Sequence, residues 1–192
     1  MAEFRIDIPD AHLPWELNLE FVGQPMGTNY FVFAMICEIL KTCEVESIIE
    51  LGTYHGALSL YLGMWAQRLG IPCVTFDVVN LHKEVEGLFD LLGIHYLEMD
   101  VFTDEAREVV LDVAHGEPTY LICDGGDKVR ELDTYLPLIP VGSVVSVHDW
   151  GTEIESVQHE DVPVEQLYRE RWQAHDARFA TIRKIGHAKK RT

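Results

Sequence analysis

Short apolar runs alternate with longer stretches of helical pattern along residues 47–147, and this alternation constrains the fold more than any other feature. The apolar runs are nearly continuous, which is typical of parallel strands covered by helices on both faces. We expect strands at 47–51, 73–77, 95–99, 119–123 and 141–147. We expect helices at 56–69, 81–92, 104–113 and 127–136. Because crossovers between parallel strands are right-handed, the pattern predicts a doubly wound, mostly parallel α/β sheet.

The two ends of the chain are less regular. Residues 30–40 have the pattern of a helix that covers the sheet, and residues 164–174 that of a helix behind the last core strand. An apolar run at 179–182 predicts one more strand. A chain of 192 residues suits a single hydrophobic core, and no repeat or linker interrupts it. We therefore expect one domain with a helical cover at 1–45, a ligand-binding core at 46–150 and a C-terminal helix and strand at 151–192.

The chain is strongly acidic, with 32 Asp and Glu against 15 Lys and Arg and a net charge of −17. Binding to a nucleic acid needs a basic face, so we expect no nucleic acid partner. No apolar stretch is long enough to cross a bilayer, and residues 1–10 lack the pattern of a secretory leader. The four cysteines have no metal or disulfide-framework spacing, which predicts reduced core thiols in a cytoplasmic protein. A homo-oligomer is left open.

Acidic residues stand at or just after the ends of the predicted strands. They are Glu50, Asp77, Asp100, Asp124 and Asp149. In an open α/β sheet, ligands bind outside the carboxyl ends of the strands, near the point where the strand order reverses. The sequence therefore predicts a binding site that is rich in carboxylates at this edge of the sheet.

The loop after the first strand differs from a dinucleotide-binding loop. Gly52 and Gly56 flank it, and glycine lets the backbone come close to a ligand. The spacing is Gly-x-x-x-Gly and not Gly-x-Gly-x-x-Gly, because Thr53 and Tyr54 stand where a second glycine is needed. Glu50 would repel a phosphate and favour a cation, which points to S-adenosylmethionine with its sulfonium and ammonium groups. We expect Gly52→Val to abolish cofactor binding by filling space that the cofactor needs.

Three segments resemble the class I S-adenosylmethionine-dependent methyltransferases. They are IIELGTYHGALSLYL at 48–62, LICDGGDK at 121–128 and VHDW at 147–150. The likeness is to the branch of cephalosporin hydroxylase-like and macrocin-type sugar O-methyltransferase proteins, and residues 23–40 resemble the helix that leads into that family's first strand. The resemblance implies a Rossmann-like fold. It also implies transfer of a methyl group to a hydroxyl oxygen of a small-molecule acceptor, such as a sugar.

The resemblance further implies which residues bind S-adenosylmethionine. Glu50, Gly52 and Gly56 would surround the methionine part of the cofactor. Asp77 would take the ribose, and Asp100 would lie near the adenine. The expected cofactor-binding residues are together Glu50, Gly52, Thr53, Tyr54, Gly56, Ser59, Asp77, Asp100 and Asp124.

A metal and a catalytic group are expected at the ends of the fourth and fifth core strands. These strands are neighbours, roughly 4.8 Å apart, so Asp124 and Asp149 should lie side by side. Two close carboxylates repel each other unless they share a proton or a cation, and Mg²⁺ would solve this while lowering the pKa of an acceptor hydroxyl. The expected metal ligands are Asp124, Asp149 and His148. Lys128 is expected as a base or an electrostatic partner, so that the expected catalytic residues are Lys128, His148 and Asp149.

Other interpretations of these residues stay open. Asp124 could cap the following helix, His148 could be a satisfied histidine with no part in chemistry, and Lys128 could be a solvated helix residue. The aspartates could also orient His148 as the base of an enzyme without a metal. On the level of function, the alternatives are an NAD-type oxidoreductase of the same fold and a cofactor-binding module without catalysis. The loop spacing argues against the oxidoreductase.

Overall fold

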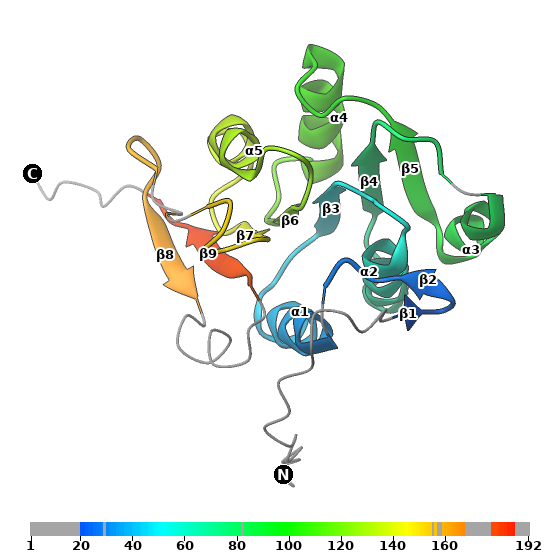
Figure 1. Ribbon diagram of the computed structural model, residues 1–192. Helices are drawn as coiled ribbons and strands as arrows, with labels where there is room; N and C mark the ends of the chain where they lie inside the picture. The colour runs from blue at the N-terminus through cyan, green and yellow to red at the C-terminus, as the bar shows by residue number, and fades with distance from the viewer. Residues whose placement is uncertain are drawn as a thin grey trace, which may run out of the picture.

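The structure is a computed structural model that describes residues 20–28, 30–81, 83–154, 156, 159–167 and 178–186. Strands and helices alternate through its centre (Figure 1). The helices are α1 (Tyr30–Thr42), α2 (Ala57–Leu69), α3 (Lys83–Leu92), α4 (Asp104–Ala114) and α5 (Lys128–Tyr135). The strands are β1 (Glu20–Phe21), β2 (Gln24–Pro25), β3 (Ser47–Leu51), β4 (Cys73–Asp77), β5 (Ile94–Glu98), β6 (Thr119–Cys123), β7 (Val144–Val147), β8 (Val164–Leu167) and β9 (Ala180–Lys184).

Seven strands form one sheet in the order β5-β4-β3-β6-β7-β9-β8. The first five are parallel, with β3 between β4 and β6, and β9 is antiparallel to both β7 and β8. This confirms the predicted doubly wound, mostly parallel sheet. The strand order reverses between β3 and β6, and this is the point at which such sheets bind ligands.

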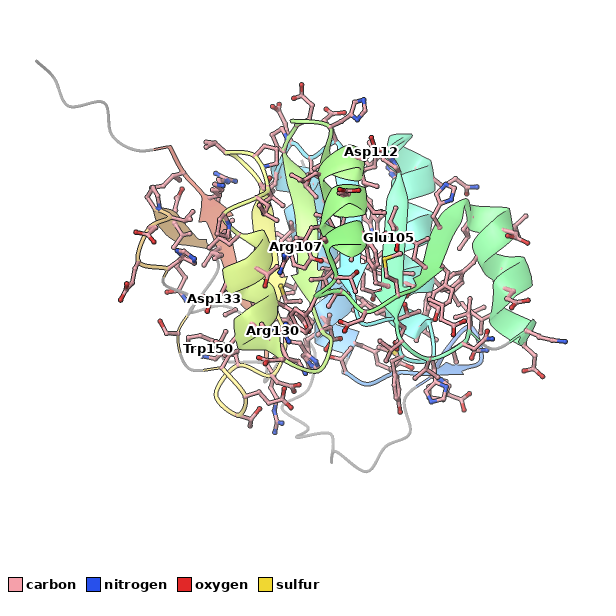
Figure 2. All side chains as sticks on the ribbon, turned by 90° about the horizontal axis from the view of Figure 1, so that it is seen from above. Glu105, Arg107, Asp112, Arg130, Asp133 and Trp150 are labelled. Carbon is pink, nitrogen blue, oxygen red and sulfur yellow. The ribbon has the colours of Figure 1, made fainter. Side chains whose placement is uncertain are left out.

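Helices cover both faces of the sheet (Figure 1). α1, α2 and α3 pack on one face through a cluster that includes Ile36, Leu62 and Phe89, and α4 and α5 pack on the other through Val110 and Tyr135. Each fully buried side chain of this kind stabilises the fold by about 1.5–3 kcal/mol. Figure 2 shows the polar side chains that α4 and α5 expose to solvent, among them Glu105, Asp112, Arg130 and Asp133.

The C-terminal part of the sheet differs from the sequence-based expectation. Residues 164–174 were expected to be helical, but Val164–Leu167 form strand β8, which pairs antiparallel with Thr181–Lys184. The apolar residues Val164 and Leu167 are three positions apart, which also suits one helical turn, so the local pattern misleads. Pairing with β9 decides the conformation, since it satisfies backbone groups that an edge strand leaves open. The remainder of the expected helix, 168–174, lies outside the described residues.

The helix expected at 30–40 is confirmed as α1, which runs from Tyr30 to Thr42. The resemblance extended this lead-in helix back to residue 23, but the two-residue strands β1 and β2 form a small antiparallel pair before α1. All four cysteines are free, and three of them are buried, as expected for reduced core thiols. Within the described ranges, no helix has the length and apolar character needed to cross a membrane.

Candidate functional site

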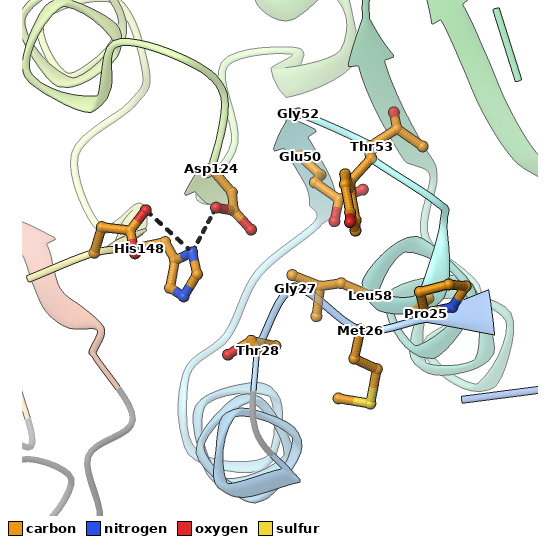
Figure 3. A pocket seen from close by; sticks show the side chains of 13 residues that line it. Pro25, Met26, Gly27, Thr28, Glu50, Gly52, Thr53, Leu58, Asp124 and His148 are labelled. Carbon is orange, nitrogen blue, oxygen red and sulfur yellow. Dashed lines mark hydrogen bonds and ion pairs between the residues drawn. The ribbon is translucent and has the colours of Figure 1, made fainter. Parts of the chain in front are cut away.

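A cavity of about 210 Å³ opens at the carboxyl ends of β3, β6 and β7, next to the reversal of strand order (Figure 3). Four parts of the chain line it: the end of β3 with its loop, the first two residues of α2, the segment 25–28 that leads into α1, and the residues that follow β6 and β7. Expected site residues in its wall are Glu50, Gly52, Thr53, Tyr54, Asp124, His148 and Asp149. Segment 25–28 was not expected there, since it has no acid, histidine or glycine-rich motif to mark it.

Glu50 is a fully buried acid in the wall of the cavity. Its Oε2 accepts hydrogen bonds from the Ser59 hydroxyl of α2 and from the Thr75 hydroxyl of β4, the latter at 2.6 Å. Its Oε1 has no hydrogen-bond partner within the part of the chain that the structure describes. Burial raises the pKa of Glu50 to about 8. A buried carboxyl group with one unpartnered oxygen beside a cavity can accept a hydrogen bond from a cationic ligand.

Glu50→Gln is expected to make the protein more stable at pH 8 than the unchanged chain, by on the order of 3 kcal/mol. The unfolded chain releases the Glu50 proton near pH 4.5, whereas the folded protein keeps it up to about pH 8. Between these values the folded state binds more protons, so its stability falls as the pH rises. Urea unfolding at pH 5, 6.5 and 8 measures this, with exposed Glu98→Gln as control. An unchanged pH dependence in Glu50→Gln would contradict the assignment.

Gly52 is required because two strand-end loops touch at this residue. Its φ is +100°, and a Cβ atom there would lie 2.4 Å from the carbonyl oxygen of Asp124 and 2.7 Å from the nitrogen of Gly125. The clash would therefore be with the protein backbone, and this changes the reason given for the expected effect of Gly52→Val. Gly56 has φ +84° and does not line the cavity, and its missing Cβ makes room for Val85 and Phe89 of α3.

The carboxylates of Asp77 and Asp100 accept hydrogen bonds from backbone N–H groups, and neither residue lines the cavity. Asp77 Oδ2 accepts hydrogen bonds from the backbone N–H groups of Thr53, at 3.0 Å, and Tyr54, at 2.8 Å. It therefore fixes the loop after β3. Asp100 Oδ1 accepts a hydrogen bond from the N–H of Phe102 at 2.9 Å, in the turn before α4. The roles in binding ribose and adenine expected for these two acids stay predictions.

The acids after β6 and β7 meet a histidine, as expected from the neighbouring strands. His148 Nδ1 lies 2.7 Å from Asp124 Oδ1 and 3.7 Å from Asp149 Oδ2 (Figure 3). The imidazole stacks on Phe179, with ring centroids 4.6 Å apart, and this contact restricts its orientation. Because a carboxylate only accepts, we assign the proton of this hydrogen bond to Nδ1. Nε2 is then left as an acceptor, and in Figure 3 it points away from the carboxylate of Asp124.

Lys128 is buried and pairs with two acids. Its Nζ lies 2.9 Å from Asp149 Oδ2 and 2.8 Å from Oε2 of Glu153, a residue that the sequence did not single out. Burial acts to lower the pKa of Lys128, but the hydrogen bonds with Glu153 and Asp149 outweigh it, and the pKa is raised. Burial acts to raise the pKa of Asp149, but the interactions with Lys128 and His148 outweigh burial, and the pKa of Asp149 is lowered. Lys128 therefore stays charged, which suits an electrostatic partner and not a base.

Glu131 supports the loop that carries Asp124. This fully buried acid of α5 accepts hydrogen bonds from the N–H groups of Gly125, at 3.3 Å, and Asp127, at 3.4 Å. Burial raises the pKa of Glu131 to about 7. The cap of α5 is Asp127, which accepts a hydrogen bond from the N–H of Arg130 at 3.0 Å, so Asp124 is not the helix cap. Glu131 escaped the sequence analysis because its position within a helix gave no signal.

Asp124, His148 and Asp149, which we call the acid cluster, offer oxygen and nitrogen ligands of the kind that bind a divalent ion. Ligand atoms of these three residues all lie within 4.8 Å of one another. All three residues nevertheless already pair within the protein: Nδ1 of His148 bonds to Oδ1 of Asp124, and the Lys128 ammonium neutralises Asp149. The arrangement therefore does not fit a resident Mg²⁺, although the donors themselves do. The unpartnered oxygen of Glu50, by contrast, fits a cationic cofactor in the cavity.

Comparison with known proteins identifies the fold. No family model matches the chain, and no curated protein matches it by sequence. CmcI, solved without ligand, superposes with a TM-score of 0.63 and 16% identity over 88% of this chain and 76% of CmcI. A Mg–SAM form of CmcI superposes with a TM-score of 0.58 and 13% identity, over 88% of this chain and 77% of CmcI. The SAH-bound methyltransferase PaMTH1 from Podospora anserina has a TM-score of 0.54 and 11% identity, over 84% of this chain and 80% of its own. The TDP-rhamnose 3′-O-methyltransferase CalS11 has a TM-score of 0.52 and 15% identity, over 80% of this chain and 76% of its own.

These structures have the class I, Rossmann-like fold of S-adenosylmethionine-dependent methyltransferases, and the present chain has the same fold. Its resemblance to this group, expected from three short segments, is confirmed at the level of structure. Identities between 11% and 16% establish the fold and leave the substrate open.

Proposed function

We propose that this chain is an S-adenosylmethionine-dependent methyltransferase that methylates a hydroxyl oxygen of a small molecule, such as a sugar. The observation that carries the proposal is one cavity with two complementary walls. On one side, the buried carboxyl group of Glu50 has an unpartnered oxygen that suits the cationic methyl donor. On the other, His148 is oriented by Asp124 as a base for the acceptor. The acidic chain disfavours polyanionic acceptors.

The reaction requires one proton transfer, and we assign His148 as the group that accepts that proton. S-adenosylmethionine, when bound, supplies an electrophilic methyl group on a positively charged sulfur. Transfer of this methyl group to the acceptor oxygen would break its bond to the sulfur and leave the electron pair of that bond on the sulfur. The hydroxyl proton moves to Nε2 of His148, and Asp124 stabilises the resulting imidazolium through Nδ1. Lys128 keeps Asp149 ionised next to the imidazole.

Cofactor binding is the first test of this function. We expect S-adenosylmethionine and its demethylated product to bind with dissociation constants of about 1–100 μM in isothermal titration calorimetry, and NADH to give no heat. Glu50→Gln should weaken binding of the methyl donor about 10- to 100-fold, because the cationic donor favours the ionised form of the Glu50 carboxyl group and glutamine cannot ionise. Exposed Glu98→Gln serves as the matched control and should bind as the unchanged protein does.

A signal with NADH but with neither methionine derivative would favour the oxidoreductase alternative and end the methyltransferase proposal. Binding without turnover on any hydroxylated acceptor, measured as release of the demethylated cofactor, would favour the non-catalytic module. The formation of a homo-oligomer stays a prediction from the sequence. The binding of Mg²⁺ by Asp124, Asp149 and His148 is also untested, and the pairing of Lys128 with Asp149 argues against it.

A further inference from the structure

Lys128 stands at an unfavourable place for a cation. It is the first residue of α5, directly after the cap Asp127, and the positive end of a helix dipole repels a positive charge there. Its side chain is only 7% exposed, so water does not compensate the charge either. Such a residue needs acidic partners, and the structure supplies two of them from one loop after β7, Asp149 and Glu153.

The loop after β7 is folded so that both acids face Lys128. Asp149 has φ +57°, which turns the chain immediately behind the strand. The N–H of Glu153 then donates to the carbonyl oxygen of Asp149 at 3.0 Å, and the N–H of Gly151 donates to Ile154 at 2.9 Å. This closed turn brings the carboxylates of Asp149 and Glu153 to the same ammonium. The oxygen of Asp149 that meets Lys128 also lies 3.7 Å from His148 Nδ1.

We propose that the Lys128 ammonium is the resident cation of the acid cluster and takes the electrostatic role that a divalent ion would otherwise have there. A divalent ion on Asp149 would have to share that carboxylate with a buried positive charge or displace it, and both are unfavourable. The protein therefore does not hold Mg²⁺ at this cluster. As a consequence, which rests on the proposed function, methyl transfer proceeds in the presence of EDTA.

Metal binding tests the role of Lys128 without reference to activity. Mn²⁺ is titrated into the full chain and followed by the loss of the electron paramagnetic resonance signal of free Mn²⁺. We expect the unchanged protein to bind Mn²⁺ no tighter than about 1 mM, and Lys128→Met to bind it at least about tenfold tighter, a change of about 1.4 kcal/mol. Lys128→Arg keeps the charge and should show no gain. Arg130→Met removes an exposed charge from the same helix and is the matched control.

Two further variants keep the outcome decisive. Lys128→Met combined with Asp149→Asn should lose the gain, which places the new ion at this cluster and not elsewhere on an acidic surface. Lys128→Gln replaces Lys128→Met if the methionine variant does not fold. Equal Mn²⁺ binding by the unchanged protein and the charge-removing variants, whether tight or absent, would overturn the proposal. Because S-adenosylmethionine binding is measured separately, failure here and failure of the methyltransferase function are distinguishable.

Discussion

His148→Ala is expected to lower kcat for methyl transfer by about 10²- to 10⁴-fold, the usual contribution of a general base. In the proposed mechanism, the substitution removes the group that accepts the hydroxyl proton. The cofactor contact proposed for Glu50 lies on the opposite wall of the cavity, so the dissociation constant of S-adenosylmethionine should change less than about threefold. Release of the demethylated cofactor with an active hydroxyl acceptor measures the rate, and calorimetry measures the affinity.

Two companion variants separate chemistry from structure. Asp124→Asn keeps the shape of the side chain but loses the charge that stabilises the imidazolium, so it should also lower kcat, with a shifted pH–rate profile. His95→Ala removes an exposed histidine on β5, away from the cavity, and should leave the rate unchanged. An unchanged kcat in His148→Ala would show that another group accepts the proton, or that the acceptor loses its proton to water.

Gly52→Val is expected to destabilise the protein by on the order of 4 kcal/mol or more and to abolish cofactor binding. A Cβ atom at this residue would meet the carbonyl oxygen of Asp124 at 2.4 Å, and neither strand-end loop can yield easily. Backbone hydrogen bonds hold both loops to the sheet: the N–H of Asp124 donates to the carbonyl oxygen of Leu51 at 2.8 Å, and the N–H of Gly52 donates to that of Phe76 at 2.9 Å. The added atoms must therefore push apart the two walls that form the cavity. Thermal unfolding and titration with S-adenosylmethionine measure the two effects.

Other glycines of the chain provide graded controls for this prediction. Gly126→Ala lies in the loop after β6, where a Cβ atom would meet nothing within 4 Å, so the stability should change by less than about 0.5 kcal/mol. Gly70→Ala adds strain from φ +72° without a clash, and about 1 kcal/mol is expected. If Gly52→Val were as mild as Gly70→Ala, the contact between the two loops would not be the reason for the glycine.

The central part of the fold could be predicted from the sequence because it depends on local pattern. Continuous apolar runs of about five residues, such as 119–123, are typical of buried strands, and the helical stretches between them indicate parallel crossovers. Strand bounds were predicted within a few residues, as for 73–77, which matches β4. The same logic brought Asp124, His148 and Asp149 together, because neighbouring parallel strands end at one edge. At the C-terminus, where strand β8 depends on pairing with β9, local pattern predicted the wrong element.

What each polar residue does at the site was decided by the tertiary structure alone. The sequence by itself determined a doubly wound sheet with carboxylates at one edge, since the periodicity of apolar residues and the alternation of strands with helices along the chain carry that information. It could not show that Asp77 turns to the backbone of the next loop, or that Glu153 and Asp149 share the ammonium of Lys128. The physical reason is that the partner of a buried charge comes from segments distant in the chain. Only their packing determines which oxygen is satisfied and which, like Oε1 of Glu50, has no hydrogen-bond partner among the described residues.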